Sequence, residues 1–402
     1  MSSYPHARFH PCSRRDFLRL GIAIGAATPL ALYRGGHALA AAEPSVPVPA
    51  YLRSNAKVAI AACRGYGPEV KTAMGQCFDL LGGIGGLVKN KTVTVKVNLT
   101  GTNFSPFMDR PVGESYMTHY STALALGTLL FSAGAKRVRF VESTNSKSQL
   151  EGTIGLAGWD ANGLKALGDV EFENTRNLGK GKQYAQLKVP WGGYLFSSFH
   201  VNHAYEETDV LVSLAKLKQH ITAGVTCSMK NLFGVTPNAL YGDQAGTEDA
   251  LAGRGPLHDP NSVPGLSLPG FKTGDNTRDA GYRVPRIVTD MNAARPVHLA
   301  IVDGITSMSG GEGPWCADAG PLAITKPGIL IAGLNAISTD AVCTALMGFD
   351  NPRAGRGTPP FDNCDNHLLL AEQAGLGVAD LTHIDVRGLS VQRARYPYVK
   401  KA

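Results

Sequence analysis

Short apolar runs alternate with amphipathic stretches along most of the chain. Residues 91–99 are the clearest strand, because every second position is apolar. Residues 115–132 follow a helical period instead and end at Gly134, a residue that suits the left-handed position after a helix. The same criteria predict strands at 58–63, 91–99, 136–141, 209–214, 298–303, 328–334 and 382–387, and helices at 68–81, 115–132, 222–233, 338–347 and 366–374.

This order of elements predicts an α/β fold with a mainly parallel sheet flanked by helices, since strand–helix–strand units pair in parallel through right-handed crossovers. Residues 150–207, richer in Gly and aromatic residues, are expected to form an antiparallel excursion. The periodicity is lost between residues 240 and 285, which predicts a long irregular insertion, either a functional lid or a poorly ordered segment. The domain is expected to span residues 57–402 behind an extended, Pro-rich leader at 43–56.

The first 42 residues have the layout of a cleaved signal peptide. Four arginines precede an apolar run at 20–32, and small residues follow up to Ala42. A run of about a dozen apolar residues is too short to cross ~30 Å of hydrocarbon, so no stable membrane span is expected after cleavage near residues 40–42.

The segment Ser13-Arg14-Arg15-Asp16-Phe17-Leu18-Arg19 resembles the twin-arginine (Tat) export signal, with Arg19 where Lys is commoner. This resemblance implies that the Tat machinery is a partner and that the protein reaches the periplasm already folded. Such cargo often carries a cofactor, a metal or a partner protein through the membrane.

Composition narrows the function classes. Hydrophobic residues at 44% and charged residues at 18% are typical of a globular protein. The net charge is +7, but five Arg and one Asp in residues 1–42 supply +4, which leaves +3 for the mature chain. Positive charge is not clustered with aromatic residues, and this excludes a nucleic-acid partner.

Six cysteines remain after residue 42, and none has the spacing of a zinc or iron–sulfur site. The cofactor is therefore unknown: the chain holds no iron–sulfur motif, while a metal bound by other residues remains open. Cys227 and Cys343 lie in apolar, helical contexts that suit buried thiols. One disulfide, Cys316–Cys364, is left open as an alternative to free thiols.

The richest cluster of polar side chains follows the strand at 209–214. If the chain stays extended from Lys216 to His220, alternate side chains point the same way, and a helix starting near Thr222 directs its free N–H groups toward them. Converging cations, an imidazole and a helix N-terminus predict a site for a small anion; the alternative is that the lysines solvate a loop. The predicted catalytic residues are Lys216, Lys218, His220 and Lys230, with Thr226 and Asn231 binding substrate.

Three further segments carry candidate residues. A lysine near the end of the strand at 91–99 is costly to bury without a partner or a cavity, unless the strand lies at the sheet edge. Asp303 ends a strand, and the Gly-rich stretch at 309–314 lets a backbone approach a ligand, although its spacing fits neither a Rossmann nor a Walker A motif. Asp340, in a first helical turn, has capping as its alternative role. The predictions are Lys96, Asn98 and Gly313 for substrate and Asp303, Glu312 and Asp340 for a metal, with His119 and Glu142 as weaker candidates.

The order of these motifs resembles a bacterial and archaeal family, domain of unknown function 362. The segments that carry the resemblance are KVNL, LAKLKQHITAGVTCSMKNLFG, DG…GGEGP and LIAGLNAISTDAVCTALMG, within residues 90–388. Many relatives append a ferredoxin-like domain whose cluster-binding cysteines this chain lacks. The family name supplies no reaction. The positions that match the family's motifs are Lys96, Asn98, Lys216, Lys218, His220, Lys230, Asn231, Asp303, Gly313, Pro314 and Asp340.

Three functions are compatible with these features. The first is a periplasmic enzyme that acts on a small anionic substrate held by the Lys/His cluster, with preplaced cations stabilising negative charge. A loosely analogous variant is a lactate-racemase-like proton or hydride shuttle. The alternatives are a non-catalytic solute or metal carrier and an accessory subunit of an exported redox enzyme.

Overall fold

A computed structural model describes residues 56–101, 104–251 and 253–398. The predicted signal peptide (1–42) and all but the last residue of the predicted leader lie outside this part of the chain. Within it, we find no helix with the length and apolar character needed to cross a membrane.

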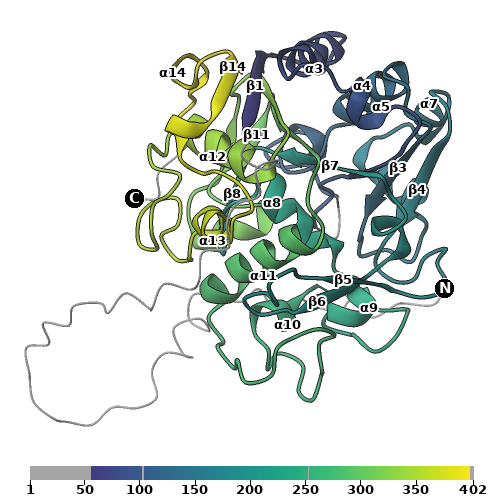
Figure 1. Cartoon of the computed structure of the whole chain (residues 1–402), viewed down its shortest axis with the longest axis vertical. Helices are drawn as coiled ribbons and strands as arrows, with labels where there is room; N and C mark the ends of the chain where they lie inside the picture. The colour runs from purple at the N-terminus through teal and green to yellow at the C-terminus, as the bar shows by residue number, and fades with distance from the viewer. Residues whose placement is uncertain (1–55, 102–103, 252, 399–402) are drawn as a thin grey trace, which may run out of the picture.

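An eight-stranded sheet forms the centre of the molecule (Figure 1). Neighbouring strands are parallel except around β13, which is antiparallel to both β1 and β10. This exception arises because β10 and β13 are joined through a small β-hairpin and no crossover helix. The prediction of an α/β fold with a mainly parallel sheet is confirmed. In spatial order the strands are β14 (Asp385–Gly388), β1 (Lys57–Ala62), β13 (Ile329–Gly333), β10 (Leu299–Gly304), β7 (Val210–Lys216), β2 (Thr92–Lys96), β3 (Arg137–Glu142) and β4 (Val170–Asn174).

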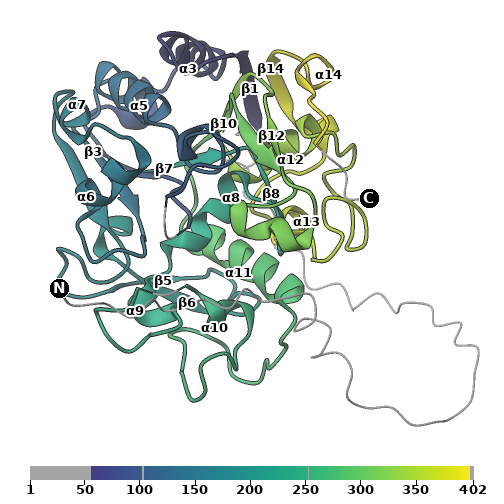
Figure 2. The same cartoon turned by 180° about the vertical axis from the view of Figure 1, so that it is seen from behind.

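Helices cover both faces of the sheet, as the two opposite views in Figures 1 and 2 show. Strand alternation supplies a hydrophobic core on each side: in β2, Val93 and Val95 face one core, while Thr94 and Lys96 point to the other face. One layer contains α3 (Glu69–Leu80), α4 (Gly85–Val88), α5 (Tyr120–Ser132), α6 (Leu150–Ile154) and α7 (Ala161–Lys165). The other contains α8 (Cys227–Asn231), α9 (Asn238–Tyr241), α10 (Gly255–His258), α11 (Ala280–Ala294), α12 (Ala336–Leu346), α13 (His367–Gln373) and α14 (Val391–Ala394).

The predicted helix at 222–233 is wrong in its first half. The chain instead forms a small antiparallel ladder of β8 (Gln219–His220) and β9 (Gly224–Val225) before α8 begins. Gly224 has a φ of +74° and lies against the ring of Phe361, a conformation and a fit that a side chain would prevent. The helical N-terminus therefore does not lie near Thr222.

Helix α11 was not predicted, because Pro285 interrupts an otherwise helical pattern. The carbonyl of Gly281, which Pro285 cannot bond, accepts a hydrogen bond from the Asp365 N–H group at 2.8 Å. Asp279 caps the helix by accepting from the Gly281 N–H group. An external partner and a cap thus allow the helix to tolerate the proline.

The predicted antiparallel excursion at 150–207 is confirmed only in part: β5 (Ala185–Lys188) and β6 (Ser198–Val201) pair antiparallel, whereas the segment before them forms α6, α7 and β4, which joins the main sheet in parallel. The predicted irregular insertion at 240–285 is irregular over most of its described residues. Its helical parts are the end of α9, the short α10 and the start of α11 at Ala280. A second small pair is β11 (Ser307–Ser309) with β12 (Ala323–Thr325).

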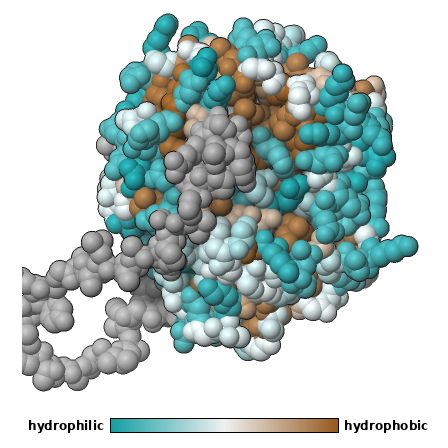
Figure 3. Space-filling view, viewed as in Figure 1, coloured by the Kyte–Doolittle hydropathy of each residue, from teal (hydrophilic) through white to brown (hydrophobic). Residues whose placement is uncertain are grey.

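All six described cysteines are buried and free, so the alternative of a Cys316–Cys364 disulfide is wrong. On the face seen in Figure 3, hydrophobic side chains gather in the upper part and hydrophilic ones cover much of the rest.

Candidate functional site

A cavity of about 430 Å³ lies where β2, β3 and β7 reach their carboxyl ends. Ligands of open α/β sheets bind in this position. Eight of the twelve predicted site residues line it: Lys96, Asn98, Lys218, His220, Thr226, Lys230, Asn231 and Glu312. The other walls come from Leu99, Thr100, Gly101, Glu142, Ser143, Asn145, Phe233, Gly234, Gly253, Arg254, His258 and Trp315.

Lys96 ends β2 and is fully buried. Its Nζ lies 2.6 Å from Oε1 of Glu142, at the end of the neighbouring strand β3, and donates to the Val97 carbonyl at 2.7 Å. Burial lowers the pKa of Lys96, while the Glu142 carboxylate opposes that effect. The Lys96 charge is therefore balanced within the wall.

Asn231 fastens α8 to the sheet. Its amide donates to the Lys96 carbonyl at 3.1 Å and to Ser213 Oγ at 3.0 Å, and its Oδ1 accepts from the Asn98 amide at 3.0 Å. With these bonds made, Asn231 positions the cavity wall and has little capacity left for a ligand.

Lys218 and Lys230 bring two ammonium groups to the cavity. Lys218 donates to the carbonyls of Tyr116 and Glu312, at 2.6 and 2.9 Å. Lys230 lies over the Phe233 ring, 4.1 Å from its centroid, and has no hydrogen bond or ion pair among the residues that the structure describes. Burial lowers the pKa of both lysines to about 7. Both therefore change charge near neutral pH.

Glu312 supplies a carboxylate beside them. Its Oε2 accepts from the Ile221 N–H group at 3.1 Å and lies 3.8 Å from Nδ1 of His220. Burial opposes ionisation of Glu312, but the His220 ring, the Ile221 N–H group and the Lys230 ammonium lower its pKa below the usual value. Burial lowers the pKa of His220 well below 6.5, so this ring is neutral at pH 7.

Arg254 and His258 complete the wall, and both come from the 240–285 segment. Arg254 donates through Nη2 to the Thr236 carbonyl at 2.9 Å, and the Arg254 carbonyl lies 2.9 Å from Nδ1 of His258. Neither residue was predicted. Irregular chain has no periodicity that would indicate which side chains face inward.

The charges in the cavity favour an anion. Among the described residues, four basic side chains line it, and Glu142 and Glu312 are the acidic ones. His258, like His220, is neutral because burial lowers its pKa. Since Glu142 pairs with Lys96, the remaining cations exceed the remaining carboxylate.

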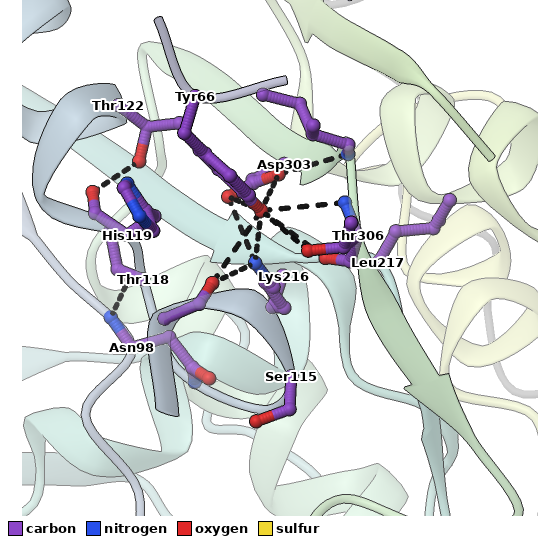
Figure 4. A network of polar contacts seen from close by, with 12 residues as sticks. Tyr66, Asn98, Ser115, Thr118, His119, Thr122, Lys216, Leu217, Asp303 and Thr306 are labelled. Atoms are coloured by element: carbon purple, nitrogen blue, oxygen red, sulfur yellow. Dashed lines mark hydrogen bonds and ion pairs between the residues drawn. The ribbon is translucent and has the colours of Figure 1, made fainter. Parts of the chain in front are cut away.

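Lys216, predicted to share this site, lies on the other face of the sheet. Its Nζ is 3.0 Å from Oδ2 of Asp303 and donates to Tyr66 Oη at 2.8 Å and to the Gly113 carbonyl at 2.5 Å (Figure 4). Lys216 and Asp303 are register partners on the parallel strands β7 and β10, so their side chains share one face. The prediction that three lysines converge on one pocket is therefore wrong for Lys216.

A family model described as a domain of unknown function, DUF362, matches residues 93–345. The chain belongs to the DUF362 family. Every residue that lines the cavity falls within the DUF362 match. No curated protein matches the chain.

A solved structure of a Thermotoga maritima protein, a structural-genomics target, is similar to this DUF362 chain with 14% identity and a TM-score of 0.35. The match covers 68% of this chain and 57% of that one, so this chain spans less than two thirds of the solved protein.

The predicted metal ligands of the DUF362 domain do not meet. Asp303 pairs with Lys216, Glu312 lies in the cavity, and Asp340 accepts from the N–H groups of Ser228 and Met229 at 2.8 and 2.7 Å. Asp340 thus caps α8, whose N-terminus is not free for an anion. The described residues hold one other group of metal-ligand types, the buried Cys227, Asp340 and Cys343, but its carboxylate already has these two partners.

Gly313 does not line the cavity either. The Trp315 ring lies over its backbone, and a Cβ there would overlap that ring. Gly313 therefore makes room for Trp315, which does line the cavity.

Proposed function

We propose that this DUF362 protein is an exported enzyme that binds a small anion in the cavity and exchanges protons with it through Lys218 or Lys230. The observation that carries the proposal is the Lys230 ammonium, which faces the cavity without a hydrogen bond or ion pair among the described residues. Lys230 is half-buried with its ammonium over the Phe233 ring, so an anion in the cavity would supply the opposite charge that the described residues do not give it.

The size of the cavity supports a small-molecule ligand. About 430 Å³ falls within the usual ~300–1,000 Å³ of such sites. Phe233 and Trp315 add apolar surface beside the charged groups, as expected where a ligand has an organic part.

Proton transfer is supported by the two lysine pKa values. General acid–base catalysis works best when the pKa of the group lies near the working pH, and burial lowers the pKa of Lys218 and Lys230 to about 7. A surface lysine, with a pKa near 10.4, would hold its proton too tightly for this role.

Native purification followed by calorimetry tests the binding half of the proposal. We expect the full chain to bind phosphate, sulfate or small carboxylates, with an affinity that falls as salt is added, because the attraction is electrostatic. Mass spectrometry of the natively purified protein is expected to find a small organic anion. Failure of every anion to bind, together with a ligand-free native protein, would contradict the proposal.

Export depends on the paired arginines of the first segment. The double variant Arg14→Lys/Arg15→Lys is expected to keep the protein in the cytoplasm, because the resemblance to the Tat signal lies in those two residues. Fractionation and immunoblotting measure the result, with Arg8→Lys as the matched control that leaves export intact. Normal periplasmic delivery of the double variant would exclude the Tat route.

A further inference from the structure

The two histidines of the cavity wall use Nδ1 in opposite ways. In His220, Nδ1 accepts from the Thr222 N–H group at 3.1 Å, so the neutral ring carries its proton on Nε2. In His258, Nδ1 lies 2.9 Å from the Arg254 carbonyl oxygen, which can only accept. Nδ1 of His258 therefore carries the proton, and its Nε2 is a bare acceptor.

Nε2 of His258 is available to a ligand. It has no hydrogen-bond partner among the residues that the structure describes, yet it is not one of their buried unpaired atoms. His258 lines the cavity, and the Phe233 ring packs against it with centroids 5.4 Å apart, which fixes its orientation. Because burial lowers the pKa of His258, this acceptor persists at neutral pH.

Other acceptors lie in the same wall. Oδ1 of Asn98 is buried without a partner in the described structure, and the Glu312 carboxylate accepts a bond at Oε2 from the Ile221 N–H group. A fully ionised oxyanion offers only acceptors, so it leaves Nε2 of His258 unpaired and desolvated. An oxyanion that keeps one O–H group supplies the missing donor. Leaving a buried acceptor unpaired costs about 1–3 kcal/mol, which makes the wall discriminate between the two.

We propose that the cavity selects a phosphorus oxyanion that retains a proton, hydrogen phosphate or a protonated phosphate ester, over sulfate or sulfonate, and that Nε2 of His258 accepts this O–H group. The proposal rests on the anion site argued above and names its ligand class and a specificity-determining residue. Lys218 and Lys230 contact the other oxygens, and the cavity of about 430 Å³ leaves room for an organic substituent.

Inorganic phosphate and sulfate form a matched pair of probes, since both are tetrahedral and near neutral pH only phosphate carries O–H groups. Calorimetric titration of the full chain is expected to give roughly 5- to 150-fold tighter binding of phosphate, the equivalent of one unpaired acceptor. In His258→Asn, the amide nitrogen still donates to the Arg254 carbonyl, but the Nε2 acceptor is lost. The difference between the two affinities is expected to disappear: phosphate loses the acceptor for its O–H group, and sulfate no longer leaves an acceptor unpaired.

The outcomes distinguish a failure of the His258 assignment from a failure of the proposed anion site. Equal affinities in the wild type, or selectivity that survives in His258→Asn, would overturn the assignment of His258 and leave anion binding standing. If neither anion binds, the anion site itself fails and this inference with it. His383→Asn is the matched control, because His383 is exposed and does not line the cavity; circular dichroism verifies the fold of both variants.

Discussion

Asp303→Ala is expected to lower the free energy of unfolding by about 3–5 kcal/mol, because it leaves a fully buried lysine without its counter-ion. Lys216 and Asp303 have no exposed side-chain surface, and their charged atoms are 3.0 Å apart. Burial lowers the pKa of Lys216, and Asp303 is the partner that opposes this shift. Urea denaturation of the purified chain measures the loss.

Two comparisons make this prediction specific. The double variant Lys216→Met/Asp303→Leu is expected to be more stable than Asp303→Ala, since it removes both charges and leaves none unpaired. Asp385→Ala breaks an exposed pair with Arg387 and is expected to change stability little. Anion affinity of folded Asp303→Ala should match the wild type, because Asp303 does not line the cavity. A stable Asp303→Ala with weakened anion binding would place the pair in the ligand site instead.

Local patterns predicted most of the sheet, because a strand or helix that packs on one face repeats its apolar residues at a fixed period. β2 and α3 follow from such patterns. The β8–β9 pair and α11 did not, since each depends on a contact from far along the chain: Phe361 against Gly224, and Asp365 bonding to Gly281. Propensity over a short window contains neither partner.

The candidate site shows the same limit. Alternation placed Lys96 on the face opposite to Val95, which the structure shows. The expectation that Lys216, Lys218 and His220 point the same way was wrong, because it needs an extended chain through all three residues. Strand β7 ends at Lys216, and the chain turns before β8 begins at Gln219. That Lys216 would pair with Asp303 depends on the β7–β10 register, which only the folded sheet sets.

Lys230→Met is expected to weaken phosphate binding about 10–100-fold, since a hydrogen bond to a charged group contributes roughly 1.5–3 kcal/mol. The Lys230 ammonium lies over the Phe233 ring, so the methionine removes this cation–π contact together with the charge but keeps an unbranched apolar side chain beside the ring. The unfolding free energy is expected to change little, because Lys230 is half-buried and has no ion-pair partner among the described residues, and only its cation–π contact is lost. Lys71→Met, on the exposed side of α3, is the matched control.

The pH dependence of anion affinity tests more directly whether Lys230 contributes its charge, because it compares Lys230→Met with the wild type as the lysines titrate. Sulfate is the probe, because it keeps its charge throughout the series. Wild-type affinity is expected to fall as the pH rises through about 7, where Lys218 and Lys230 lose their protons. Unfolded lysines keep their protons up to about 10.5, so between these values the unfolded chain binds more protons and ligand-free stability rises with pH. In Lys230→Met only Lys218 titrates in this range, and the fall in affinity becomes shallower; an equally steep fall in that variant would show that Lys230 does not contribute its charge to the site.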